Sequence, residues 1–391
     1  ARVYTEQADE TVVVQGPPVR IAFDAQGQPT KAAEGFARTQ GVGVADLERL
    51  DTPKGEVLSL KKHVPGRAAT DLLAEALPEV LRTLPQPKTM RWGAERFTFL
   101  RPIHWILALL GDDVIPATIA GVAAGRETRA HRFRGNQPLP VRDRADYERT
   151  LAAHHVLPAA DVRAARIAEQ IATSLALLGQ QAPLPEGRAY QVREALADHD
   201  FLREVANLTE SPRVLLGTFD AQHLEIPADI LVTAMKYHQR YFPIWDMAQA
   251  GGDQPRRLTN RFAVVTNLPP DAPDAVCQTV MAGNERVLRA RLADAAFFVA
   301  EDRKQPLESF VDALEGRIFL QGLGTVRDKV TRLERLAADL VGLLGGLAPC
   351  FAGDAFRARA VRVARLAKAD LSTAVVGEFP ELQGIMGRHY A

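Results

Sequence analysis

The spacing of apolar residues changes along this chain, and that change most limits what it can fold into. Before about Gly283, strand-like segments alternate with helical ones, as where Val214 to Leu216 precedes the helix that Pro227 opens. After Gly283 the spacing is helical throughout. It is most regular after Thr325, with intervals of four and three between Val326, Val330, Leu333, Ala337, Leu340 and Leu344. We therefore predict an α+β fold in which a mixed α/β part precedes an all-α module.

The length of the chain predicts more than one core. A single hydrophobic core stops growing at about 250–300 residues, and this chain has 391. We predict an N-terminal α/β region over residues 1–150 and a central α/β region over residues 151–320. Residues 321–391 are expected to begin an all-α helical domain.

Local signals predict individual elements. Thr30 is expected to cap a helix that stops at Gly41, and residues 19–23 are expected to form a short strand. Residues 240–245 and 262–266 are expected to pair as antiparallel strands across a polar loop. Further helices are expected at residues 68–84, 145–153, 161–178, 284–299, 306–314 and 354–376.

The charge balance restricts how the chain can meet nucleic acid. Lys and Arg total 48, and so do Asp and Glu, so the net charge is zero. A chain that wraps nucleic acid over its whole surface is normally basic, so any contact must come from a local patch. No DNA partner is expected.

Cysteine content and apolar runs indicate the compartment. Cys277 and Cys350 lie far apart and suit a reducing environment, and the apolar run 103–110 is too short to cross a bilayer. We expect a cytoplasmic protein with no membrane partner. The chain starts at Ala1 and its last helix has no cap, so both ends are expected to be trimmed.

Familiar catalytic patterns are missing from the sequence. It has no G-x-x-x-x-G-K-S/T loop, no G-x-G-x-x-G after a strand and no G-x-S-x-G elbow. Its His and Cys residues show no zinc-ligand spacing. His199-Asp200 is similar to the metal-binding pair of phosphohydrolases, but one dipeptide is common by chance. We predict no catalytic residue and no metal site in this chain.

An arginine-rich loop is the strongest local basic patch. Four guanidinium groups within nine residues, beside Phe133, could grip phosphates and stack on an exposed base. The alternative is a solvated loop whose charges pair with nearby acids such as Glu127 and Asp143. The four candidates for nucleic-acid contact are Arg126, Arg129, Arg132 and Arg134.

Two other segments offer candidate RNA contacts. Lys236, Gln239 and Arg240 join the end of a helix to a strand and could face RNA, although basic residues there also complement the helix dipole. On the helix after Gly283, most charges can pair with each other, Glu285 with Arg289 and Arg291 with Asp294. Arg286 has no such partner and is therefore a further candidate.

Five motifs resemble one family. They lie in the same order over essentially the whole chain, and the last is the most specific. The motifs are Thr30 to Phe36, Met90 to Trp105, His238 to Pro243, Gly283 to Phe298 and Glu378 to Ala391. On these residues the chain is similar to the beta subunit of bacterial glycyl-tRNA synthetase.

The resemblance implies an assembly of two alpha and two beta subunits. The alpha subunit is expected to hold ATP, Mg²⁺ and glycine, so no cofactor is expected on this chain. The beta subunit is expected to recognise tRNA(Gly). Its front half is similar to a domain of the phenylalanyl-tRNA synthetase beta subunit. A degenerate HD-type helical module and a C-terminal anticodon-binding part follow, and the latter is expected to be missing from this sequence.

The function expected from this resemblance is that of a non-catalytic, tRNA-binding beta subunit of glycine–tRNA ligase. It would support the ATP-dependent attachment of glycine to tRNA(Gly) by the alpha subunit. Two alternatives remain open. The chain could be an architectural platform for alpha-subunit assembly with little RNA contact, or a hydrolase that acts through the HD-like module.

Overall fold

The computed structural model forms two compact units. It describes residues 4–94, 96–135, 137–248, 256–351 and 353–391. One unit comprises residues 1–130 and 136–150, and the other comprises residues 131–135 and 151–391. Helices and strands are both plentiful, which confirms the α+β class. No helix in the described ranges is long and apolar enough to cross a membrane.

The first unit contains small antiparallel sheets. Its largest sheet has the order β1-β3-β2, and Ala22 of α1 and Ala33 of α2 pack against Leu58 of β3. Its elements are β1 (Glu10–Pro18), α1 (Val19–Ala22), α2 (Lys31–Gln40), β2 (Glu48–Thr52), β3 (Gly55–Val64), α3 (Ala69–Thr83), β4 (Met90–Arg91), β5 (Thr98–Phe99), β6 (Ile106–Leu107), β7 (Leu109–Leu110), β8 (Asp113–Val114), β9 (Thr118–Ile119), β10 (Val122–Gly125), β11 (Glu127–Arg129) and β12 (Pro138–Pro140). Helix α4 (Arg144–Ala153) follows in the sequence.

The second unit is built on one antiparallel sheet of order β13-β15-β16-β14. Its strands and helices are α5 (Ala160–Gln181), β13 (Arg188–Gln191), α6 (Arg193–Ala197), α7 (His199–Asn207), β14 (Pro212–Thr218), α8 (Ala228–Thr233), β15 (Phe242–Ala248), β16 (Arg257–Asn267), α9 (Asp274–Asp302), β17 (Ile318–Leu320), β18 (Gly324–Thr325), α10 (Val326–Leu347), α11 (Asp354–Leu366), α12 (Ala374–Glu378) and α13 (Ile385–Tyr390). Shorter turns include η2 (Arg132–Arg134), the π-helical η4 (Ala234–His238), η5 (Leu307–Phe310), η6 (Asp312–Gly316) and η8 (Ala369–Ser372).

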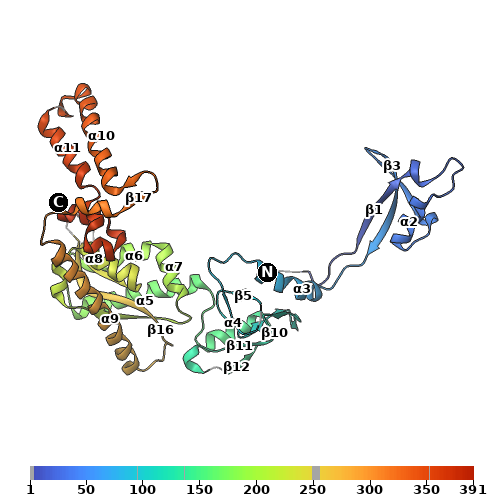
Figure 1. Ribbon diagram of the computed structural model, residues 1–391. Helices are drawn as coiled ribbons and strands as arrows, with labels where there is room; N and C mark the ends of the chain where they lie inside the picture. Colours follow the sequence, from blue (N-terminus) through green and yellow to red (C-terminus); the bar gives the residue numbers. More distant parts are fainter. Residues whose placement is uncertain (1–3, 95, 136, 249–255, 352) are drawn as a thin grey trace. The chain divides into compact units, whose positions relative to one another are not determined.

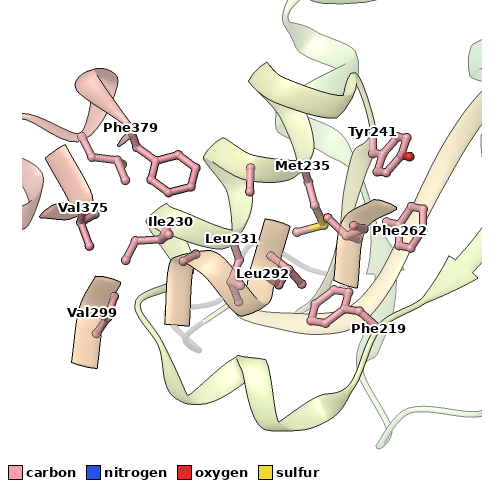
Figure 2. Packing of buried hydrophobic residues seen from close by; sticks show 14 of the residues in the cluster. Phe219, Ile230, Leu231, Met235, Tyr241, Phe262, Leu292, Val299, Val375 and Phe379 are labelled. Atoms are coloured by element: carbon pink, nitrogen blue, oxygen red, sulfur yellow. The ribbon is translucent and has the colours of Figure 1, made fainter. Parts of the chain in front are cut away.

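Side chains of β16 alternate between two cores, one on each face of the sheet. Ala263 and Val265 pack with the cluster that includes Ile167 and Ile171 of α5. Phe262 and Val264 pack on the other face, with residues from α8, α9 and α12. Figure 2 shows Phe262 beside Met235 and Tyr241 in this second core. Both faces of the sheet are therefore packed, so a loop attached to the ends of its strands is held in place.

The C-terminal segment belongs to the core of the second unit. Val375, Val376 and Phe379 pack with Ile230 and Leu231, as Figure 2 shows for the labelled side chains. Residues on both sides of position 320 therefore contribute to one hydrophobic core. Helices α10 and α11 lie side by side as an antiparallel pair (Figure 1).

Several predicted elements are confirmed, and a few are wrong. Thr30 caps α2, Gly41 ends it with φ of 72°, and the pairing of β15 with β16 is as expected. Residues 19–23 are mostly a helical turn rather than a strand, which places Ala22 in the core. The 306–314 segment forms 3₁₀ turns, and the helix expected over 354–376 is broken between α11 and α12. Part of the predicted polar loop, residues 249–255, lies outside the described residues.

Candidate nucleic-acid interface

The structure divides the four arginines of the predicted loop between the two units. Arg126 and Arg129 belong to the first unit. Arg126 donates to the carbonyl oxygen of Asp112 at 2.7 Å. Arg129 lies 3.7 Å from a carboxylate oxygen of Glu127, and its guanidinium lies 5.6 Å from the centre of the Trp105 ring. Both side chains therefore have local partners. The pair between Arg129 and Glu127 is one that the solvated-loop alternative expects.

Arg132 and Arg134 lie in a short turn of the second unit, residues 131–135, which we call the 131–135 turn. His131 is fully buried and anchors it. The His131 Nδ1 accepts from the N–H of Phe133, and its Nε2 lies 3.1 Å from Oδ1 of Asn267 at the end of β16. The same oxygen accepts from the N–H groups of Glu210 and Ser211. The turn is thus fastened to the rigid sheet.

This anchoring leaves the three side chains after His131 facing outward. Phe133 is 64% exposed, which is unusual for a side chain of this size. Arg132 is exposed and has no hydrogen bond or ion pair to any described residue. Arg134 pairs with Asp271, and its guanidinium holds the pKa of that carboxyl below its ordinary value. The turn therefore presents one free cation, one aromatic face and one neutralised cation.

A groove lies beside the 131–135 turn. It has a volume of about 430 Å³ and is mostly apolar. The segment that forms its far side, residues 268–273, is held by Arg213, whose Nη1 donates to the carbonyl oxygen of Ala272 at 3.0 Å. The groove is lined by Phe133, Arg134, Leu268, Pro269, Asp271, Ala272, Pro273, Val276 and Val280. An aromatic face at the rim of an apolar groove, with cations beside it, can hold an unstacked base and its phosphate.

A second groove, of about 780 Å³, adjoins the same 268–273 segment. Pro270 and Arg213 line it together with Arg166 of α5. Arg166 is half-buried, and its side chain makes no hydrogen bond or ion pair within the described ranges. No sequence pattern singles out Arg166, because it lies within an ordinary amphipathic helix. Only the fold brings it near a loop that follows more than one hundred residues later.

The second candidate segment is shaped by an unusual backbone. Residues 234–238 form a π-helical turn, and Arg240 adopts a positive φ of 60°. Such departures are concentrated at functional sites. The N–H of Tyr241 closes the turn onto the carbonyl oxygen of Met235 at 2.8 Å. Tyr241 donates from its hydroxyl to Asn284, and burial raises its pKa to about 12.

The basic residues of that segment are neutralised. Lys236 Nζ lies 2.7 Å from a carboxylate oxygen of Asp198, and its ammonium holds the pKa of Asp198 below the ordinary value. Arg240 Nε donates to Glu204 at 2.7 Å. Gln239 is half-buried and has no hydrogen bond among the described residues. Two of the three predicted contacts are therefore committed to acidic partners within the protein.

Arg286 is exposed on α9 and has no polar partner in the described part of the chain. The charge pairs predicted around it are wrong. Glu285 accepts from the N–H of Thr218 at 2.8 Å, and Arg291 lies 3.4 Å from Glu378. Both partners are distant in sequence and are brought close by the packing of α9. No contact in the described ranges joins Arg286 to the 131–135 turn.

Among the described residues, no three His, Cys, Asp or Glu side chains lie close enough together to hold a metal ion. His199 and Asp200, at the start of α7, are both exposed.

Comparison with known proteins adds one consistent finding. The family model described as glycyl-tRNA synthetase beta subunit matches residues 1–391. The chain is 42% identical over 387 residues to the glycine–tRNA ligase beta subunit of Geobacter metallireducens, covering 99% of this chain and 52% of that protein. It is 43% identical over 388 residues to that of Chromohalobacter salexigens, with 99% and 51% covered. It is 39% identical over 391 residues to that of Syntrophus aciditrophicus, with 100% and 52% covered. The chain thus spans about half the length of these curated relatives.

Proposed function

Because this chain belongs to the glycyl-tRNA synthetase beta subunit family, we propose that it is the tRNA-binding, non-catalytic subunit of a glycine–tRNA ligase. In this proposal it supports the ATP-dependent attachment of glycine to tRNA(Gly). The alpha subunit holds ATP and Mg²⁺, two copies of each subunit assemble, and the complex works in the cytoplasm. We also propose that the chain retains the phenylalanyl-synthetase-like and HD-type folds that the resemblance implies.

One observation carries the proposal: the 131–135 turn exposes Arg132, and its neighbour Phe133 lines an apolar groove. Stacking a nucleobase on Phe133 would remove from water the apolar surface that the fold leaves exposed. A base stacked on an aromatic ring contributes about 1–3 kcal/mol of binding free energy. A phosphate next to that base would pair with the free guanidinium of Arg132. RNA therefore matches the exposed groups of this turn better than an apolar ligand alone.

We expect the double variant R132A/F133A to bind tRNA(Gly) more weakly, because it removes one stacking face and one phosphate contact. The expected loss is roughly 5- to 150-fold, which corresponds to about 1–3 kcal/mol. The slope of log Kd against log salt should also decrease by about 0.7–0.9. Filter binding over a KCl series measures both quantities.

The matched control is R144A. Arg144 lies on α4, its side chain is 83% exposed, and it pairs only with Glu148 among the described residues. Its removal changes the net charge by one, as in the double variant. Equal affinities of R132A/F133A and R144A, at unchanged melting temperature, would exclude the 131–135 turn. Formation of glycyl-adenylate from ATP and glycine by the isolated chain would contradict the non-catalytic assignment.

A second candidate function is assembly with the alpha subunit, and the outer face of α10 favours it. Four leucines, at intervals of four, three and four, are each more than half exposed. Regular apolar spacing of this kind is typical of a helix that packs against a partner helix. The four residues are Leu336, Leu340, Leu343 and Leu347.

We expect L340E/L347E to reduce copurification of the alpha subunit at least tenfold, because each change places a charge in a buried contact. Leu177 is also about half exposed, on α5, and L177E is the control. If both variants retain the alpha subunit equally, the outer face of α10 is not the contact. The described residues contain no group of three His, Cys, Asp or Glu side chains that could hold the metal the hydrolase alternative would use.

A further inference from the structure

Helix α11 stands out from the rest of this neutral chain by its charge. Its 13 residues contain four arginines and one acid, Asp354, at the start. The chain as a whole has equal numbers of acidic and basic residues. An excess of cations on one helix is therefore a local property of this surface.

Three of the arginines share one face of α11. Arg359, Arg362 and Arg365 are spaced three residues apart, so they lie within about a third of the helix circumference. All three are exposed, and Figure 1 shows α11 next to α10 as one of a helical pair. Their span along the axis is about 9 Å, at about 1.5 Å per residue.

Two alanines precede these arginines on the same face of α11. Ala355 and Ala358 are exposed there, and between Arg362 and Arg365 the side chain of Val363 is 68% exposed. Arginine side chains at such a surface can converge on phosphate oxygens and donate two hydrogen bonds to one group. A duplex strand has one phosphate per about 3.4 Å of its axis. A stripe of this length can therefore contact two or three phosphates.

Only one carboxylate among the described residues forms an ion pair with this face. Arg362 pairs with Glu308 of η5, and no other described acid forms an ion pair with the three arginines. The backbone N–H of Glu308, the Arg362 hydrogen bond and the charges of Arg362 and Arg365 hold the pKa of Glu308 below its ordinary value. By contrast, Lys236, Arg240 and Arg134 each have a carboxylate of their own. The α11 face thus carries two guanidinium groups with no acidic partner among the described residues.

We propose that the exposed face of α11, formed by Arg359, Arg362 and Arg365, binds the phosphate backbone of tRNA. The inference rests on the proposed tRNA-binding function and adds a surface separate from the 131–135 turn. The contact is electrostatic and independent of base identity, since guanidinium–phosphate pairs carry no sequence information. Its role is to hold the RNA in register while other residues contact bases.

The test uses the 391-residue protein and a tRNA(Gly) transcript. The variant R359Q/R362Q/R365Q removes three cations and keeps residues that favour a helix. We expect the slope of log Kd against log salt to fall by about 1.4–2.7, for two or three lost contacts at about 0.7–0.9 each. At about 0.1 M salt the Kd should rise at least tenfold.

A matched control removes the same charge elsewhere. In R142Q/R144Q/R149Q, three arginines on or beside α4 are lost, whose side chains are 76%, 83% and 66% exposed. A general effect of net charge would weaken both triple variants equally, and this result would overturn the proposal. The expected result is that only the α11 variant is weakened.

A variant that is expected to strengthen tRNA binding distinguishes the loss of a contact from a folding defect. E308Q keeps the shape of Glu308 and frees Arg362, so we expect tighter tRNA binding and a slope steeper by up to about 0.7–0.9. Unchanged binding by both E308Q and the α11 triple variant would overturn the proposal.

The remaining outcomes separate this inference from the proposed function. If R132A/F133A weakens tRNA binding and the α11 variant does not, the inference fails and the function stands. If wild-type protein binds tRNA(Gly) no better than bovine serum albumin does, the proposed function fails and the inference fails with it. If the α11 variant loses the alpha subunit but keeps tRNA, the face is a protein contact and the inference is wrong.

Discussion

Replacing Phe262 with Ala is expected to lower the free energy of unfolding of the second unit by about 3–5 kcal/mol. Phe262 lies in β16 and is fully buried. Its ring stacks on Tyr241, with centroids 4.8 Å apart, in the core that Figure 2 shows. Removal of the ring leaves a cavity that the surrounding strands and helices cannot close, because they are packed from both faces of the sheet.

Urea unfolding followed by the fluorescence of Trp245 measures this effect. Trp245 lies in β15, and replacing Trp92 and Trp105 with Phe leaves it as the only reporter. The control is F297A, since Phe297 is 58% exposed on α9 and its removal should cost less than about 1 kcal/mol. Equal losses for F262A and F297A would contradict the two-sided core.

Replacing Asp302 with Ala is expected to cost about 2–4 kcal/mol and to release the C-terminal segment. Asp302 is only 4% exposed, at the end of α9. Its carboxylate accepts from the N–H groups of Ala374 and Val375, at 2.7 and 3.0 Å, and so caps α12. It also accepts from the hydroxyl of Tyr390 at 3.1 Å. Without it, three donors lose their acceptor and the segment loses its only buried anion from α9.

Limited proteolysis together with urea unfolding checks this prediction. Cleavage between α11 and α12 should become faster in D302A, because the core contacts of Val375 and Phe379 depend on the cap. The control is D294A, which removes an exposed carboxylate from the same helix. Stability and cleavage rates equal to those of D294A would show that packing alone retains the segment.

Local signals in the sequence predicted the elements that depend on near neighbours. Thr30 and Gly41 bound α2 as expected, since a cap and a left-handed glycine act within one turn. The helix expected over 354–376 is broken before α12, which begins with Thr373 as its N-cap. Asp302, a residue far back in the chain, also accepts from the first N–H groups of α12. Helix α9 begins ten residues earlier than predicted and continues through Gly283, because packing against the sheet outweighs the cost of one glycine.

For the candidate site too, the sequence predicted some features and the tertiary structure decided others. The residue types, their clustering and the α+β character could all be derived from the sequence. Which of the basic residues are free was decided by the tertiary structure. Lys236 is neutralised by Asp198 and Arg134 by Asp271, which lie 38 and 137 residues away.

The physical reason is that an ion pair depends on distance in space, whereas periodicity and capping depend on distance along the chain. The sequence by itself determined where helices and strands begin to form and which segments carry charge. Only the packing of α5, α7 and α9 on the sheet decided which charges were paired. Arg132 at the 131–135 turn was left available for a partner. The packing of α11 against α10 likewise left the arginines of α11 exposed.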